Sequence, residues 1–323
     1  MTPKNVPASI RARLLNLSRE WQEDFQMLLN RYARERLLYR LSQSSYRDRF
    51  ILKGATLFSV WADKPFRSTM DADFLSFGPS DVESVIAVFR ELCRNAGHHD
   101  GGGGNQDDDQ DLPADDGVQF DAGSVQGAQI REEEEYAGVR ILLDAFIGKA
   151  KARVQVDVGF GDAITPEAQE IELPVILDLP APRLRGYPKE TVVAEKLQAM
   201  TVLADTNSRM KDFYDIWVMQ RYFAFAGADL AKAIQATFDR RRTAIEPSSC
   251  LAFQSSFYAS EEPLTRWRLY VSRGSFEKVP PSFAEVGASI EAFLRPVCES
   301  IAREEPFSRV WPPGGPWQPK EDE

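Results

Sequence analysis

The sequence contains few of the residues that cross-link chains or bind soft metals. It has three cysteines and two histidines in 323 residues, and Cys93, Cys250 and Cys298 lie far apart. A disulfide scaffold needs more cysteine in a shorter chain, so we expect reduced, mostly buried thiols. No window approaches the roughly 18 consecutive apolar residues of a membrane helix, and the amino terminus lacks the apolar stretch of a signal peptide. These absences favour a cytoplasmic globular protein with no membrane partner.

Positive charge is also in deficit, but the deficit is local. The formal net charge of -10 is dominated by residues 98–117, which contain seven Asp and no Lys or Arg, and by Glu132 to Glu135. Glycine and like charges predict that residues 98–117 form a solvated loop. The rest of the chain is near neutral, with basic stretches in the first 50 residues and at residues 207–245. These stretches fit either solvated helix faces or a track for a polyanion, so net charge does not exclude a nucleic acid.

Helical spacing of apolar residues dominates both ends of the chain, with alternating segments between them. We expect helices at residues 9–41 (one or two), 80–95, 191–203, 209–223, 228–241 and 283–301. A capping box of Ser80 and Glu83 is expected to open the second of these helices. Strands are expected at residues 71–77, 118–120, 139–143 and 153–158.

This order of elements predicts an α+β fold. We expect a mixed β-sheet with flanking helices, followed by a helical carboxyl-terminal half. The predicted segments are a helical segment at 1–45, a core at 46–180 that includes the acidic loop, a helical domain at 181–305 and an irregular tail at 306–323.

Three carboxylates in the core carry the main chemical signal. Asp71 and Asp73 are two apart on a predicted strand and therefore project to the same face. In RVQVDVGFG, Asp157 points away from the valines on a second strand. Carboxylates placed side by side repel unless a cation lies between them, and three form an oxygen-lined site suited to Mg²⁺. Such a site performs phosphoryl or nucleotidyl transfer, although an isolated Asp-x-Asp pair also occurs in turns and on solvated edges.

Further candidates flank this pattern. In LKGAT, Gly54 allows backbone N–H groups to approach an anion while Lys53 adds a positive charge. In the second half, Lys211, Asp212 and Asp215 are expected to share one side of a helix. They form either an exposed salt bridge or, with Lys196, a group that neutralises and orients a triphosphate.

The order of these motifs resembles a known family. LKGAT, RSTMDADF, VQVDVGFGD, YPKETVVAEKLQAM and NSRMKDFYDIW together, over roughly residues 35–245, are similar to the AbiEii/AbiGii toxin nucleotidyltransferases of the DNA polymerase beta-like superfamily. The resemblance implies a nucleotidyltransferase-type fold, use of Mg²⁺ and a nucleoside triphosphate, and a cognate antitoxin. It also implies transfer to the 3′ end of tRNA, which would stop translation, as in abortive infection.

The same resemblance assigns roles residue by residue. Asp71, Asp73 and Asp157 match the metal-binding and catalytic carboxylates. The positions that match nucleotide-binding motifs are Lys53, Gly54, Ser68, Lys196, Lys211, Asp212 and Asp215. One departure is Ala55, where the family often has Gly or Ser, so a methyl group is expected near the phosphates.

The leading hypothesis is therefore a Mg²⁺-dependent nucleotidyltransferase toxin with an RNA acceptor, preferably tRNA. One alternative is nucleotide transfer to a protein or to a small molecule such as an antibiotic. Another is a non-catalytic protein that binds a nucleotide or RNA, although binding alone does not require three carboxylates.

Overall fold

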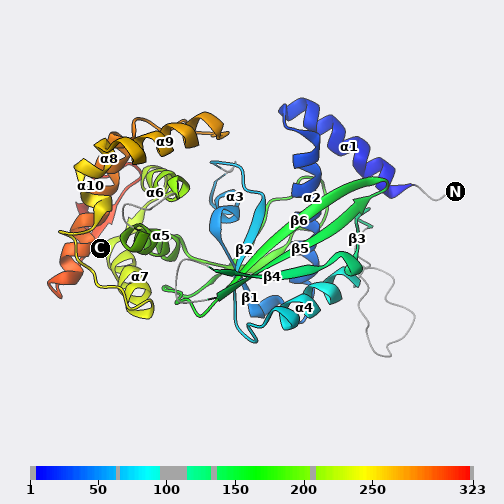
Figure 1. Ribbon diagram of the computed structural model, residues 1–323, viewed down its shortest axis with the longest axis horizontal. Coiled ribbons are helices and arrows are strands. Elements are labelled where there is room, and N and C mark those ends of the chain that lie inside the picture. The colour runs from blue at the N-terminus through cyan, green and yellow to red at the C-terminus, as the bar shows by residue number, and fades with distance from the viewer. Residues whose placement is uncertain (1–4, 63–65, 95–114, 132–136, 204–208, 321–323) are drawn as a thin grey trace. The chain divides into compact units, whose positions relative to one another are not determined.

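The computed structural model describes residues 5–62, 66–94, 115–131, 137–203 and 209–320 (Figure 1). The chain divides into two compact units. Unit 1 comprises Met1–Asp63, Thr69–Gly161 and Glu170–Gly186, and unit 2 comprises Lys64–Ser68, Asp162–Gln169 and Tyr187–Glu323. Most of the predicted acidic loop and the run Glu132 to Glu135 lie outside the described residues. No described helix is both long and apolar enough to cross a membrane.

Unit 1 is built on a mixed sheet of eight strands. The strands are β1 (Phe50–Lys53), β2 (Asp71–Ser76), β3 (Gln119–Phe120), β4 (Gln126–Arg131), β5 (Ala137–Ile147), β6 (Ala150–Phe160), β7 (Gln169–Glu172) and β8 (Arg183–Gly186). The order across the sheet is β3-β5-β6-β2-β1-β8-β7, and β4 also pairs with β5. Strand β2 runs parallel to β6 and antiparallel to β1. The predicted α+β class with a mixed sheet is confirmed.

Alternating apolar and polar residues determine which side chains of the central strand β6 are buried. In β6 the valines Val154, Val156 and Val158 are fully buried, whereas Gln155 and Asp157 are half-buried, as the period-two pattern predicts. Strands β5 and β6 form a hairpin in register from Ile147↔Ala150 onward. On its other side β6 pairs with β2, so the two strands that hold the predicted carboxylates are neighbours, which the sequence alone did not establish.

Four helices accompany this sheet: α1 (Val6–Trp21), α2 (Phe25–Ser42), α3 (Phe58–Trp61) and α4 (Val82–Arg94). The single amphipathic stretch expected at residues 9–41 is two helices, the second capped by Asp24, whose side chain accepts the Met27 N–H. Helix α4 packs against β4 and β5 (Figure 1). The predicted capping box was displaced by one residue, because Asp81, not Ser80, accepts the Ser84 N–H at 2.8 Å.

Three arginines of the basic amino-terminal stretch are buried within the fold. Arg36 and Arg40 of α2 are buried and pair with Asp116 at 3.2 and 3.4 Å, and Arg34 donates to the Thr69 carbonyl at 2.9 Å. Asp116 belongs to the segment predicted to be solvated, so that prediction is wrong at its carboxyl-terminal end. Asp116 also accepts the Val118 N–H at 2.9 Å, so two arginines and a backbone donor surround this carboxylate.

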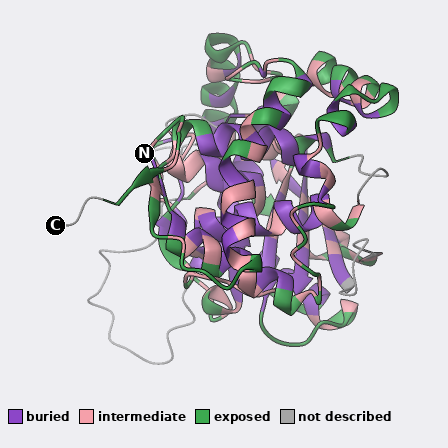
Figure 2. Cartoon of the chain, turned by 90° about the vertical axis from the view of Figure 1, so that its left-hand side faces the viewer, coloured by how far each residue is buried: buried purple, intermediate pink, exposed green. Residues whose placement is uncertain are grey.

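Unit 2 is mainly helical. Its helices are α5 (Lys189–Leu203), α6 (Met210–Tyr222), α7 (Gly227–Arg240), α8 (Ser255–Ala259), α9 (Glu261–Arg273) and α10 (Phe283–Ala302). The four longer expected helices, α5, α6, α7 and α10, are confirmed within two residues, while α8 and α9 were not anticipated. Phe213 on α6 stacks on Phe257 and meets Phe283 edge-on, with ring centroids 5.8 and 5.3 Å apart. Buried positions, purple in Figure 2, run through the helices and strands of both units.

The carboxyl-terminal tail, expected to be irregular, forms a small sheet. Strands β9 (Phe225–Ala226), β10 (Arg309–Trp311) and β11 (Gln318–Pro319) pair antiparallel in the order β11-β10-β9. Trp311 donates its indole N–H to Gln220, and Trp317 donates to Phe293 and stacks on its ring. Pro and Gly disfavour regular strands, and the packing of these aromatic side chains stabilises the segment in spite of that.

The cysteines behave as expected from their number and spacing. All three are buried and unbridged. Burial raises the pKa of Cys93 to about 12, so this thiol stays protonated and unreactive at neutral pH.

Candidate active site

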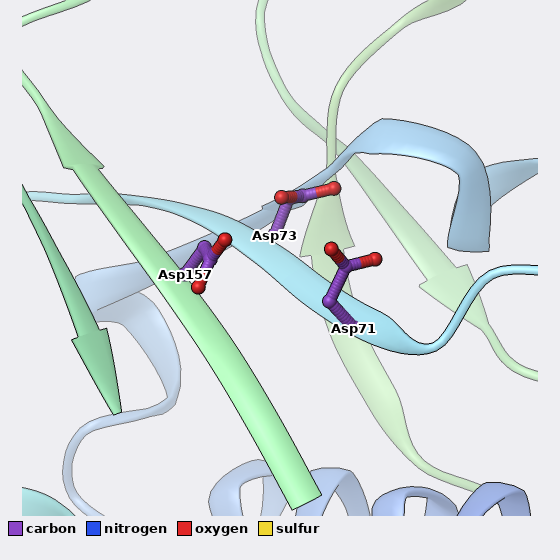
Figure 3. Close-up of side chains that lie close together, drawn as sticks. All are labelled: Asp71, Asp73 and Asp157. Carbon is purple, nitrogen blue, oxygen red and sulfur yellow. The ribbon is translucent and has the colours of Figure 1, made fainter. Parts of the chain in front are cut away.

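Three carboxylates converge at the centre of the unit 1 sheet. Asp71 and Asp73 project from β2 and Asp157 projects from β6, where the pairing sets Asp73 beside Asp157 (Figure 3). One oxygen of each side chain lies within 4.8 Å of the other two. All three side chains are half-buried, so they are open to a ligand. They are the only described group of three or more metal-ligating side chains that meets this distance.

Neighbouring polar groups hold Asp71 in place. Thr69 donates its hydroxyl to Asp71 Oδ1 at 2.7 Å. Arg34, buried behind the strand, interacts electrostatically with Asp71 and Asp73. Burial lowers the pKa of Arg34, and the two carboxylates oppose that shift. These contacts partly offset the mutual repulsion of the carboxylates.

Lys53 and Gly54 lie beside the carboxylates, as the sequence predicted. Lys53 is opposite Asp73 in the antiparallel β1–β2 pair and so shares its face of the sheet. Gly54 opens a short 3₁₀ turn, Gly54–Leu57, with a φ of 76°. A Cβ atom at this position would lie 2.1 Å from Asp73 Oδ2. Glycine is therefore needed both for the backbone conformation and for the close approach of the carboxylate.

Asp157 has a partner that sequence reasoning missed. Arg140 on β5 is directly opposite Asp157 in the sheet register. Its Nε and Nη2 donate to the two oxygens of Asp157 at 2.8 and 2.6 Å. Gln155, two residues earlier on β6, donates more weakly at 3.4 Å. No signal in the sequence distinguished Arg140 from other strand arginines, because the partnership depends on the β5–β6 register.

The donor set of this site fits a hard divalent cation. Each of the three side chains offers carboxylate oxygen, the ligand type that Mg²⁺ prefers. Octahedral Mg²⁺ with bonds of about 2.1 Å places neighbouring ligands about 3 Å apart, so oxygens within 4.8 Å of one another could share one ion after the side chains turn towards it. The described part of the chain offers no sulfur or imidazole ligand here. The arrangement is able to bind a metal ion.

The predicted second-half residues lie in unit 2 and form a buried ion cluster. Lys196 on α5 donates to Asp212 and Asp215 of α6, each at 2.7 Å. Arg67 binds both oxygens of Asp215 at 2.7 and 2.8 Å, and Arg209 reaches Asp212 at 2.8 Å. Both carboxylates are fully buried. The cluster contains three cations and two anions.

The cluster keeps its members ionised. Burial alone would raise the pKa of Asp215, but Arg67 and Lys196 outweigh it and lower the pKa to about 2. Burial would likewise lower the pKa of Lys196, yet Asp212 and Asp215 raise it above its ordinary value. Removing one member would leave an uncompensated buried charge.

Lys211 and Ser68 differ from this group. Lys211 is exposed, although Asp212 and Asp215 on the same helix are fully buried. Lys211 therefore differs in exposure from the two aspartates with which it was expected to group. Ser68 is exposed in the segment Lys64–Ser68, next to Arg67. Ala55 is buried, so its methyl group is packed in unit 1.

Comparison with known proteins gives two levels of similarity. None of the curated proteins matches the sequence. Among solved structures, JHP933 from Helicobacter pylori has 12% identity and a TM-score of 0.47, covering 86% of this chain and 94% of its own. A second H. pylori structure, provisionally assigned as a nucleotidyltransferase, has the same identity and TM-score and covers 87% and 99%. Similarity at this level adds nothing to the assignment of the chemistry.

A protein family, in contrast, matches most of the chain. The nucleotidyl transferase AbiEii toxin family, of type IV toxin–antitoxin systems, matches residues 36–289. The matched region includes all three carboxylates of unit 1 and the ion cluster of unit 2. Membership implies nucleotidyl transfer from an NTP and an antitoxin partner. The chain belongs to the AbiEii nucleotidyl transferase toxin family.

Proposed function

We propose that this nucleotidyltransferase uses Mg²⁺ to transfer a nucleotide from an NTP to the 3′ hydroxyl of an RNA, with tRNA as the preferred acceptor. The observation that carries the metal dependence is the convergence of Asp71, Asp73 and Asp157 within 4.8 Å. Three carboxylates this close together repel one another, and a bound cation would relieve that repulsion in the working state. The identity of the acceptor is a separate part of the proposal and is argued below.

The reaction forms one P–O bond and breaks another. The 3′ oxygen of the acceptor attacks the α-phosphorus of the NTP, and its hydroxyl proton passes to solvent. The bond from that phosphorus to the bridging oxygen of the β-phosphate breaks, and pyrophosphate leaves. A Mg²⁺ ion held here would lower the pKa of the attacking hydroxyl and neutralise charge on the triphosphate. Asp71 and Asp73 are assigned to hold the metal, and Asp157 completes the site next to the attacking oxygen.

Other residues of unit 1 support this chemistry. Lys53 shares the face of Asp73 and is assigned to the triphosphate, together with backbone N–H groups at Gly54. Arg140 fixes the orientation of Asp157 by a bidentate contact. Lys211 and Ser68 are exposed and remain candidates for nucleotide contacts. Lys196, Asp212 and Asp215 are assigned first to the integrity of unit 2.

An RNA acceptor is favoured by cations along β6. Arg153 and Lys151 are four and six residues before Asp157, so both face the same side of the sheet. Their side chains are about half exposed, at 49% and 55%, and contact Asp144 of β5 at 3.5 and 2.8 Å. A polyanion that passes along this strand would meet Lys151 and Arg153 before it reaches Asp157 and its partner Arg140. Addition to a tRNA acceptor end would block aminoacylation and explain toxicity.

Label transfer tests the proposal. The protein, Mg²⁺ and total tRNA are incubated with each NTP labelled at the α- or the γ-phosphate. Nucleotidyl transfer moves the α-label to RNA and never the γ-label. Periodate-treated tRNA, whose terminal diol is destroyed, is the matched control acceptor and should accept no label.

The alternative acceptors are tested in the same experiment. A protein extract and an aminoglycoside replace tRNA in parallel reactions. Label on either of these but not on RNA would replace the RNA proposal while retaining nucleotidyl transfer. NTP binding without transfer to any acceptor would favour a non-catalytic binding protein.

A further inference from the structure

Arg140 makes a bidentate contact with one carboxylate of the triad. Its guanidinium spans both oxygens of Asp157 from the neighbouring strand, and the two residues are directly opposite in the register. The Asp157 side chain is 13% exposed and the Arg140 side chain 41% exposed. A contact of this kind fixes the orientation of a carboxylate more tightly than a single hydrogen bond does.

The contact leaves Asp157 able to bind a metal. An ionised carboxylate has about four lone-pair sites, and Arg140 occupies two of them. With this contact in place, an Asp157 oxygen already lies within 4.8 Å of oxygens from Asp71 and Asp73. The guanidinium thus holds the third carboxylate next to the other two despite their repulsion.

We propose that Arg140 is a positioning residue of the metal site, which holds Asp157 in the orientation that completes the three-carboxylate ligand set. The inference rests on the metal-dependent function proposed above. Arg140 acts through Asp157 and touches neither metal nor substrate in this role. Hydrogen-bond partners of metal ligands commonly contribute about 10- to 100-fold to metal affinity or activity.

Arg153 provides a matched control on the same face of the sheet. It is four residues before Asp157 on β6, is similarly exposed, and pairs with Asp144 rather than with the triad. Loss of either arginine removes one positive charge from the region. If only charge mattered, both substitutions would strengthen cation binding, because they remove a repelling cation. If orientation matters, only the Arg140 substitution weakens it.

The experiment measures Mn²⁺ binding to the full-length protein without nucleotide, by calorimetry or by the spin-resonance signal of free Mn²⁺. The variants are Arg140→Ala, Arg140→Lys and Arg153→Ala, each checked for thermal stability. We expect Arg140→Ala to weaken Mn²⁺ binding by about 10- to 100-fold. Arg140→Lys keeps the charge but loses the planar fork, so it should fall between Arg140→Ala and the parent. Arg153→Ala should bind Mn²⁺ at least as tightly as the parent.

Two results would overturn the inference: unchanged or tighter Mn²⁺ binding in Arg140→Ala, or no Mn²⁺ binding by the parent protein. Transfer assays separate this failure from failure of the proposed function. Label transfer by a parent protein whose Mn²⁺ affinity is insensitive to Arg140 removes only the positioning role. Conversely, if Mn²⁺ binding depends on Arg140 but the parent protein transfers no label, only the proposed reaction is rejected. If Arg140→Ala lowers kcat, if high Mg²⁺ restores it, and if the KM for NTP is unchanged, the result would support the role of Arg140 in positioning Asp157.

Discussion

At the scale of single residues, the position of Asp73 depends on a neighbour without a side chain. Gly54 adopts a φ of 76°, and a Cβ there would collide with the Asp73 carboxylate at 2.1 Å. We expect Gly54→Ala to displace Asp73, and a misplacement of about 1 Å can cost roughly 100-fold in rate. Nucleotide transfer and thermal unfolding of the variant should be measured together.

The control for this substitution is Gly148→Ala in the β5–β6 turn. Gly148 has a similar φ of 62°, but a Cβ there would meet only Pro7 at an ordinary 3.7 Å. Both variants should lose about 1–2 kcal/mol of stability from the left-handed backbone, and only Gly54→Ala should lose transfer. Equal activity in the two variants would show that Gly54 has no role in placing Asp73.

The carboxylates could be predicted from sequence and their partners could not. Asp71, Asp73 and Asp157 follow from the period-two alternation of two strands, which is a local property. Arg140 meets Asp157 only because β5 and β6 pair in one particular register. Arg34 and Arg36 were counted as surface charge because nothing local shows that Thr69 and Asp116 accept their hydrogen bonds.

At the scale of elements, α6 shows why helix faces were harder to predict. Ten of its thirteen residues are buried, so apolar spacing does not mark a solvent-facing side. Asp212 and Asp215 are fully buried because Lys196, Arg67 and Arg209 surround them from outside the helix. The existence of α6 was predictable from its apolar pattern, while the exposure of each charged residue depended on other segments.

The ion cluster predicts different outcomes for two lysines. Lys196→Ala leaves two buried carboxylates without their shared cation, so we expect it to lower the unfolding free energy by about 3–5 kcal/mol. Lys211→Ala removes an exposed side chain and should change stability by less than about 0.5 kcal/mol. Denaturant unfolding measures both. A Lys196→Ala protein of parental stability but with a raised KM for NTP would instead assign Lys196 to the triphosphate.

Helix α2 carries a pH-sensitive group. Glu35 is buried and accepts the Ile176 N–H at 2.7 Å. Burial raises its pKa from 4.5 to about 7, against the opposing effects of Ile176 and Arg36. The folded protein therefore keeps this proton between about pH 4.5 and 7 while the unfolded chain loses it, and stability falls as pH rises through that window.

Glu35→Gln tests this linkage. The variant keeps an acceptor for Ile176 but cannot ionise, so it should become more stable than the parent with rising pH, by up to about 3 kcal/mol above pH 7. Urea unfolding at pH 5, 6, 7 and 8 measures the difference. Parallel stability curves for the two proteins would mean that Glu35 titrates equally in the folded and unfolded chain.

At the scale of the whole molecule, the acidic excess is concentrated in one segment of the sequence. Residues 99–114 contain five Asp and no Lys or Arg, and they lie outside the catalytic motifs. We expect replacement of these residues by a short Gly/Ser linker to leave nucleotide transfer within about two-fold of the parent, because none of the proposed functional residues is removed. Loss of transfer would reveal a function of this segment.

The deletion must stop before Asp116. That residue pairs with Arg36 and Arg40, so Asp116→Asn should destabilise unit 1 even though the shortened segment does not. Melting temperatures of the two variants make the comparison. Composition did not predict that Lys64–Ser68 and Asp162–Gln169 join unit 2 from within the unit 1 sequence.

The central claim is that Asp71, Asp73 and Asp157 form the metal site of a nucleotidyltransferase. The most direct measurement is transfer of α-labelled NTP to tRNA by the parent and by Asp73→Asn, with and without Mg²⁺. We predict transfer by the parent only with Mg²⁺, and loss of at least about 1,000-fold in Asp73→Asn without loss of folding. Transfer that persists in the folded Asp73→Asn protein, or that proceeds without a divalent ion, would contradict the account.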